Sequence, residues 1–127
     1  MGYTIGKTFG FSASHRLPGL PTGHKCARDH GHNYLVEVVL TADVLTAPGF
    51  VTDFGDLTPF RDYVDSVFDH RCLNDVMDVP PTCENLAAHF ADWVTTNLEP
   101  LIPGRLVSVQ VAETATTWAR YTVERMT

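Results

Sequence analysis

The sequence predicts an α+β fold in which four strands form an antiparallel sheet and two helices cover one of its faces. Segments with alternating apolar residues lie near both ends of the chain, at 3–14, 33–43, 106–113 and 118–125. Such alternation is typical of strands with one buried face. The middle of the chain instead repeats apolar residues at helical spacing, at 57–68 and 82–98. The resulting order, ββααββ, is expected to form two layers around one core.

The first strand is predicted from Phe9, Phe11 and Ala13, which share one parity, and it is expected to end near His15. Residues 17–29 contain two prolines and two glycines and are expected to form a loop. The second strand, 33–43, shows the strongest strand pattern, with an apolar run that Glu37 interrupts. Residues 46–55 then form a turn rich in proline and glycine.

The first helix is predicted to begin after Asp56, which is a residue type that caps helix N-termini, and Pro59 is tolerated in its first turn. The second helix is predicted to begin after Thr82 as N-cap and to end near Pro100. The apolar residues that support the two helices are Leu57, Phe60, Val64, Val67 and Phe68 for the first and Leu86, Phe90, Trp93, Val94 and Leu98 for the second.

Length and composition favour one ordinary globular domain that spans residues 1–127. Hydrophobic residues make up 44% of the chain, which is enough for a core without disulfides. No apolar run reaches the roughly 18–20 residues that a membrane helix needs. The beginning of the sequence lacks the pattern of a signal peptide. The three cysteines have no paired spacing, so a reducing compartment, by default the cytoplasm, is expected.

The net charge of −6 argues against general nucleic-acid binding. Acidic residues are concentrated in residues 43–99, which hold eleven of the fifteen Asp and Glu residues. The histidine-rich segment by contrast carries three positive side chains, Arg16, Lys25 and Arg28, and one negative side chain, Asp29. A basic pocket in an acidic protein favours a small anionic substrate over a polymer.

The most informative stretch is 13–33, which holds four of the six histidines. His30 and His32 are two residues apart at the start of a predicted strand, so their side chains are expected on one face, roughly 7 Å apart. His15, at the end of the preceding strand, can approach as a third ligand if the two strands pair. Three histidines with an open fourth position are the ligand set of a catalytic zinc site.

Other reactive side chains surround this stretch. Cys26 lies four residues before His30 and can serve as a fourth ligand, a buried apolar residue or a reactive thiol. Nearby cations favour a thiolate, and therefore a base or nucleophile. Asp69 and His70 are adjacent and can form a proton-transfer pair, although adjacency alone is weak evidence. Glu113, at a strand end, is either a surface acid or an anchor for an amino-substituted nitrogen heterocycle.

Taken together, the motifs resemble the 6-pyruvoyl-tetrahydropterin synthase superfamily over nearly the whole chain. The match is nearest to the branch that forms 6-carboxy-5,6,7,8-tetrahydropterin, because only three residues separate Cys26 from His30. The motifs are, in order, Phe11-x-Ala13-x-His15-Arg16-Leu17, Cys26-x-x-x-His30-Gly31-His32, Asp53-Phe54-Gly55-Asp56-Leu57, Asp69-His70-x-x-Leu73-Asn74, Pro81-Thr82-x-Glu84-Asn85 and Glu113-Thr114.

The resemblance implies the tunnelling fold, in which ββααββ subunits assemble into a barrel, usually a homohexamer of two stacked trimers with sites at subunit interfaces. It also implies a zinc-dependent carbon–carbon lyase that converts 7,8-dihydroneopterin triphosphate to the 6-carboxy product, acetaldehyde and triphosphate, in queuosine or other 7-deazapurine biosynthesis. No nucleic acid or membrane partner is expected.

By position, the resemblance implies a role for each site residue. The zinc ligands are His15, His30 and His32, Cys26 is the proton acceptor, and Asp69, His70 and Glu113 form the relay. Glu113, Thr82 and Cys83 contact the pterin. Independently of the resemblance, the local positive charge makes Arg16, Lys25 and Arg28 the expected triphosphate contacts. The sequence departs from the family pattern at Cys83, where Ser or Thr is usual, and at the bulky Trp118.

Two alternative functions remain open from the sequence. One is another pterin side-chain reaction at the same site, either the 6-pyruvoyl synthase or an aldolase-like cleavage of dihydroneopterin. The Cys26 spacing disfavours the former, and the presence of Cys26 disfavours the latter. The other is a non-catalytic, zinc-stabilised binding subunit, which would tolerate Cys26→Ala.

Overall fold

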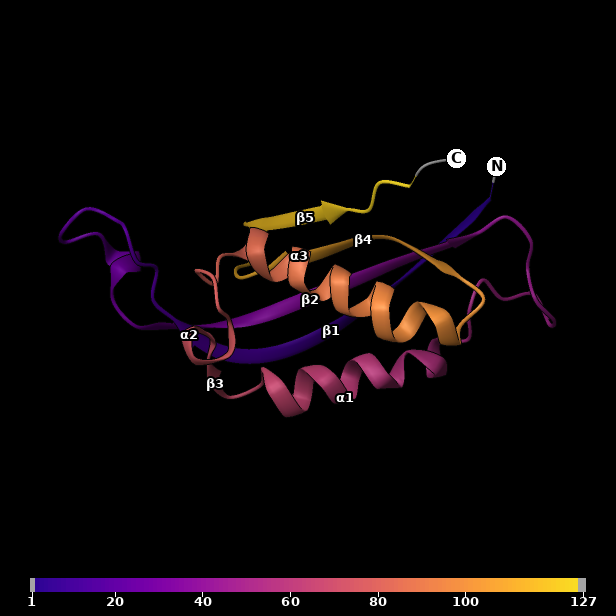
Figure 1. Ribbon diagram of the computed structural model, residues 1–127, viewed down its shortest axis with the longest axis horizontal. Coiled ribbons are helices and arrows are strands. Elements are labelled where there is room, and N and C mark those ends of the chain that lie inside the picture. Colours follow the sequence, from indigo (N-terminus) through magenta and orange to yellow (C-terminus); the bar gives the residue numbers. More distant parts are fainter. Residues whose placement is uncertain (1, 126–127) are drawn as a thin grey trace.

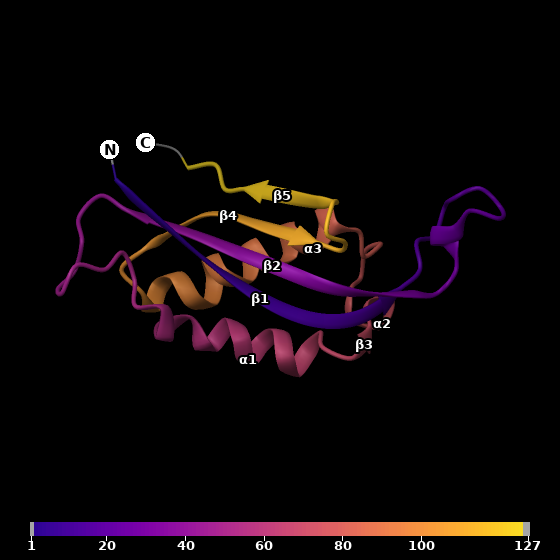
Figure 2. The same cartoon turned by 180° about the vertical axis from the view of Figure 1, so that it is seen from behind.

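Two helices cover one face of a twisted sheet in the computed structural model, which describes residues 2–125 (Figure 1). The sheet has five strands in the order β3-β1-β2-β4-β5. Seen from behind, the same sheet lies in front of the helices (Figure 2). The predicted α+β class is therefore confirmed. The single chain forms an open sheet, so the barrel in the prediction could only arise by assembly.

The two longest strands form a hairpin that positions the histidine-rich segment. β1, Tyr3–His15, pairs antiparallel with β2, His30–Ala42, in register from Tyr3 opposite Ala42 to His15 opposite His30. Alternate residues of both strands are buried, as the alternation predicts. The predicted second strand began at residue 33, but the ladder extends to His30. The loop 16–29 projects from this end of the hairpin (Figure 1).

The first helical segment begins differently from the prediction. A short 3₁₀ turn, η2 (Phe54–Leu57), precedes α1 (Thr58–Val67), and the side chain of Asp53 accepts the backbone N–H of Gly55. Asp53 rather than Asp56 is therefore the capping residue. Pro59 lies in the first turn of α1, where backbone N–H groups have no intrahelical acceptor, so the N–H that proline lacks costs the helix no hydrogen bond.

The second predicted helix is α3, Cys83–Trp93, which continues as a π turn, η3 (Val94–Leu98), and a 3₁₀ turn, η4 (Glu99–Leu101). Thr82 caps α3, because its side chain accepts the backbone N–H of Asn85 at 3.1 Å, as predicted. The chain then returns through β4, Arg105–Ala112, and β5, Trp118–Thr122, which pair antiparallel.

The prediction of four antiparallel strands was wrong in one respect. A fifth strand, β3 (Arg71–Cys72), pairs parallel with β1 opposite Ala13 and Ser14, and a single-turn helix, α2 (Leu73–Val76), follows it. A strand of two residues is too short to produce an alternating pattern. It forms because His70, at a φ of 58°, turns the chain sharply toward the edge of β1.

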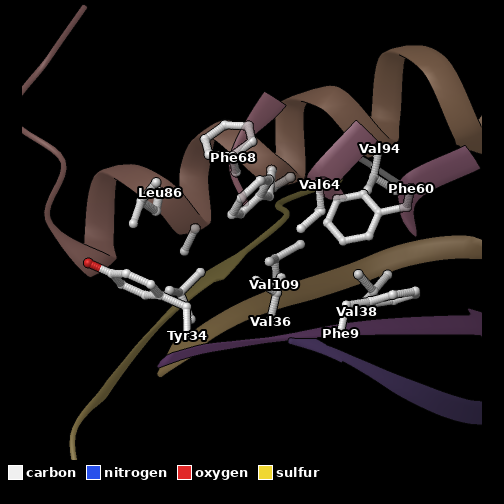
Figure 3. Close-up of a cluster of buried hydrophobic side chains, with 14 of the residues drawn as sticks. Phe9, Tyr34, Val36, Val38, Phe60, Val64, Phe68, Leu86, Val94 and Val109 are labelled. Atoms are coloured by element: carbon white, nitrogen blue, oxygen red, sulfur yellow. The ribbon is translucent and has the colours of Figure 1, made fainter. Parts of the chain in front are cut away.

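The core lies between the sheet and the two helices (Figure 3). Aromatic rings contribute many of its contacts. The ring of Phe60 from α1 meets Phe9 of β1 edge to face, with the ring centroids 5.0 Å apart, and meets Phe90 of α3 with the centroids 5.5 Å apart. Edge-to-face contact is a preferred geometry for such rings. This packing holds α1 and α3 against β1. No helix in the described part of the chain has the length and apolarity to span a membrane.

Candidate metal centre and surrounding site

The hairpin register brings three histidines together at one end of the sheet. His15 ends β1, His30 begins β2 opposite it, and His32 lies two residues further along β2. Each ring offers a nitrogen, and the three nitrogens lie within 4.8 Å of one another. His15 is buried, while the other two are partly exposed. The cluster could hold a metal ion, as the sequence predicted.

Hydrogen bonds fix the protonation of two of these rings. His15 Nδ1 lies 2.8 Å from the carbonyl oxygen of Pro81, and His30 Nδ1 lies 2.7 Å from that of Arg28. Because a carbonyl oxygen can only accept, both Nδ1 atoms carry the proton and donate it. In a neutral imidazole the other nitrogen, Nε2, is then a bare lone pair. This is the arrangement in which proteins present histidine to a metal.

The two Nε2 atoms face each other 2.9 Å apart, within hydrogen-bond distance. With both Nδ1 atoms protonated, this contact is favourable only when a proton or a metal ion is bound on the Nε2 side. An all-imidazole ligand set with an open fourth position suits zinc among the common metals. The residues present therefore fit the metal that the resemblance implies.

Glu113 adds negative charge beside the cluster. It directly follows β4, and its Oε2 lies 3.9 Å from His15 Nε2 and 3.7 Å from His32 Nε2. Burial lowers the pKa of His32, although Glu113 opposes that shift. The balance favours neutral His32, which is the form that binds a metal.

A cavity of about 620 Å³ opens on this cluster. Two of the metal-site histidines, His30 and His32, line it together with Glu113. Its remaining wall contains Cys26 and two of the three expected triphosphate contacts, Lys25 and Arg28. The structure thus brings a thiol, a metal cluster, a carboxylate and two cations to one cavity. Arg16, the third cation, instead lies 3.7 Å from Asp29 Oδ1 and 3.9 Å from the Cys72 thiol.

The Asp69–His70 pair lies on a neighbouring cavity. His70 Nδ1 lies 2.9 Å from Asp69 Oδ2, so the two side chains do interact. The backbone N–H of Ser12 and the His70 side chain hold the pKa of Asp69 below its usual value. The cavity that His70 lines, about 470 Å³, shares Gly31 and His32 with the cavity of Cys26.

The two predicted pterin contacts, Thr82 and Cys83, lie at the start of α3. The Thr82 hydroxyl is occupied as the helix cap. Cys83 is buried, and its pKa is raised to about 12, first by burial and then by Glu113. Cys83 is therefore a neutral thiol that interacts with the predicted pterin anchor.

Sequence reasoning missed one residue of this site. Tyr34 is fully buried, and its hydroxyl lies 3.2 Å from His15 Nδ1. It looked like an ordinary core position of a strand. The sequence did contain one indication of its place in the site. Tyr34 lies two positions after His32 on the same strand, so its side chain faces the same side of the sheet.

Comparison with known proteins identifies the family. The family model described as 6-pyruvoyl tetrahydropterin synthase matches residues 4–124. The chain belongs to this family. The resemblance inferred from the motifs is thus confirmed, and with it the expectation of an enzyme.

Individual relatives of the family span nearly the same length. The chain is 38% identical to the 6-carboxy-5,6,7,8-tetrahydropterin synthase of Synechocystis sp., over 98% of this chain and 96% of that protein. It is 34% identical to human 6-pyruvoyl tetrahydrobiopterin synthase, over 87% and 84% of the two chains. An uncharacterized protein from Wolinella succinogenes shares the fold with a TM-score of 0.87, at 22% identity over 98% and 99% of the chains.

Proposed function

We propose that this family member converts 7,8-dihydroneopterin triphosphate to 6-carboxy-5,6,7,8-tetrahydropterin, with release of acetaldehyde and triphosphate, in a zinc-dependent reaction. The observation that carries the proposal is the cavity lined by Cys26, Glu113 and two histidines of the triad, His30 and His32. A thiol, a Lewis-acid site and a carboxylate anchor are the groups that a pterin side-chain lyase needs.

The spacing of Cys26 favours the 6-carboxy product over its 6-pyruvoyl counterpart. Three residues separate Cys26 from His30, which is the short spacing that the resemblance associates with the carboxy branch. The Synechocystis relative with the printed carboxy name agrees with this assignment. The human relative carries the 6-pyruvoyl name and is the reason to keep that product as the second candidate.

In this proposal His15, His30 and His32 hold zinc through Nε2 of the first two and one ring nitrogen of the third. When bound there, zinc would polarise the side-chain hydroxyls of the substrate and make their neighbouring protons more acidic. The carbonyls of Pro81 and Arg28 keep two of the rings in the ligating tautomer.

Proton transfer is assigned to the side chains on either side of the histidines. Cys26 removes a proton in the first cavity. Asp69 and His70 handle protons from the second cavity, where the carboxylate stabilises a protonated His70 ring. Glu113 binds the aminopyrimidinone edge of the pterin and takes part in the relay, and Thr82 and Cys83 complete its surroundings.

The triphosphate is assigned to the cationic side of the first cavity. Lys25 and Arg28 line that cavity, and Arg16 lies beside it through its contact with Asp29. Charge-assisted hydrogen bonds from such groups contribute more than neutral ones. The small anionic substrate expected from the charge distribution is then bound in a basic region of an acidic chain.

The placement of the Asp69–His70 pair supports an oligomeric enzyme. His70 lines a different cavity from Cys26, although both cavities meet at Gly31 and His32. A site formed between subunits would let His70 of one copy face Cys26 of another. We therefore propose a homohexamer, a dimer of trimers, whose size light scattering would measure directly.

A turnover assay tests the proposed function. Zinc-loaded protein is given 7,8-dihydroneopterin triphosphate without oxygen, and the products are identified by mass. We expect the 6-carboxy product together with acetaldehyde, which would place the enzyme before a step that consumes this pterin, such as 7-deazapurine formation. A 6-pyruvoyl product would assign the protein to the sister activity. Absence of turnover with zinc bound would refute both lyase reactions.

A further inference from the structure

The hydroxyl of Tyr34 is a buried polar group beside the metal cluster. The side chain is fully buried, and its ring stacks on Phe11 with the ring centroids 4.9 Å apart. Figure 3 shows the hydroxyl directed toward the start of α3, away from the remainder of the aromatic core. Its polar neighbour is His15, whose Nδ1 lies 3.2 Å away. A hydroxyl placed this deeply requires a hydrogen-bond partner.

The direction of that hydrogen bond follows from the Pro81 carbonyl, which contacts the same nitrogen of His15. His15 Nδ1 also lies 2.8 Å from the Pro81 carbonyl oxygen, which can only accept. If Tyr34 donated to Nδ1 instead, the proton of the ring would sit on Nε2 and block the metal side. With the proton on Nδ1, the ring donates to Pro81, and the Tyr34 oxygen shares the same proton as a second acceptor.

We propose that Tyr34 is a positioning residue for the metal centre, which holds His15 in its ligating tautomer and orientation and links it to the start of α3. The proposal rests on the proposed metal-binding function of the triad. It assigns Tyr34 no contact with substrate or metal. Groups that orient a ligating histidine typically contribute roughly 10- to 100-fold to metal affinity.

The surroundings of the hydroxyl support the link to α3. Pro81 directly precedes Thr82 and Cys83, the two predicted pterin contacts at the start of the helix. Tyr34 itself lies on β2, the strand that carries His30 and His32, and its hydroxyl contacts His15 of β1. Tyr34 therefore contacts one ligand of the triad from the strand that carries the other two.

The variant Tyr34→Phe removes the hydroxyl and keeps the ring that stacks on Phe11. Tyr63→Phe is the matched control, because Tyr63 is partly buried and, like Tyr34, hydrogen-bonds a histidine (His89 Nε2, 2.6 Å) and stacks on an aromatic ring, Trp93. Both variants are titrated with Zn²⁺ against a competing chelator. Co²⁺ is then substituted, and its visible spectrum reports the ligand geometry.

We expect Tyr34→Phe to bind Zn²⁺ about tenfold more weakly and to change the Co²⁺ spectrum. The control should match the parent protein in both measurements. Unchanged affinity in Tyr34→Phe would overturn the proposal, and so would tighter binding, since that result means Tyr34 donates to Nδ1 and disfavours the ligating tautomer. Because neither readout requires turnover, a wrong substrate assignment would leave this test intact.

A second measurement needs no variant and covers the case in which Tyr34→Phe fails to fold. Long-range nitrogen–proton correlations of the imidazole rings in the metal-free parent protein identify which nitrogen of His15 carries the proton. We expect Nδ1. A proton on Nε2 would contradict the hydrogen-bond direction from which the proposal follows.

Discussion

Asp69 accepts the backbone N–H of Ser12 at 2.9 Å. The next residue, His70, donates its own backbone N–H to the Ser12 carbonyl at 2.6 Å, so one residue of β1 holds both members of the pair. Ser12 lies three positions before His15 on the same strand. The proposed proton relay and the metal centre are therefore built on one rigid element, which keeps their relative position fixed while loops move.

Replacing Asp69 by Asn should make stability less sensitive to acid. Because the folded-state pKa of Asp69 is lowered, the carboxylate stabilises the fold above its ordinary value of 3.8, and this contribution is lost as the pH falls through the lower, folded-state pKa. Urea midpoints of metal-free protein between neutral and strongly acidic pH measure the effect. The control Asp62→Asn, at an exposed position, should show the same dependence of the urea midpoint on pH as the parent protein. The same dependence in Asp69→Asn would refute the prediction.

Removing one ligand of the triad should abolish stable metal binding. His30→Ala leaves His15 and His32 with two ligand nitrogens and frees the carbonyl of Arg28. We expect metal content after dialysis to fall to a small fraction of the parent's value. His24→Ala, which removes an exposed imidazole from the loop that precedes His30, is the control and should retain the metal. Stoichiometric metal in His30→Ala would show that the triad is not the site.

Cys26→Ala should separate catalysis from metal binding. Loss of a proton-transferring group typically costs about 10²- to 10⁴-fold in rate. Metal content should stay at the parent's level, because the metal cluster consists of histidines alone. Cys72→Ala, which removes a thiol from the neighbouring cavity, serves as control. Full activity in Cys26→Ala would instead support a binding subunit.

The cationic side chains should differ in their effect on KM. Lys25 and Arg28 line the cavity, whereas Arg16 lies against Asp29. Each lost charge-assisted contact to the triphosphate should raise KM about tenfold, since such hydrogen bonds contribute roughly 1.5–3 kcal/mol. Single Ala variants assayed at low and high salt measure this. An Arg16→Ala effect larger than that of Arg28→Ala would reverse the assignment, and unchanged KM with all three replaced would refute it.

The sequence alone determined the layers and the three histidines that could hold a metal ion. The strand period of two puts His30 and His32 on one face, and the pairing of the two strands places His15 opposite His30. Apolar periodicity likewise identified both major helices, and Thr82 was recognisable as a cap. These features depend on local spacing, which a single sequence displays directly.

Only the tertiary structure decided what lies around those ligands. The pairing of β3 with β1 depends on a turn at His70, and the assignment of Lys25 and Arg28 rather than Arg16 to the cavity depends on the course of an irregular loop. The role of Tyr34 as a polar neighbour of His15 is recognisable only in the folded chain. There the carbonyl oxygen of Pro81, far along the chain, contacts the same Nδ1 atom of His15 as the Tyr34 hydroxyl does. Such contacts join residues distant in sequence, and no local periodicity records them.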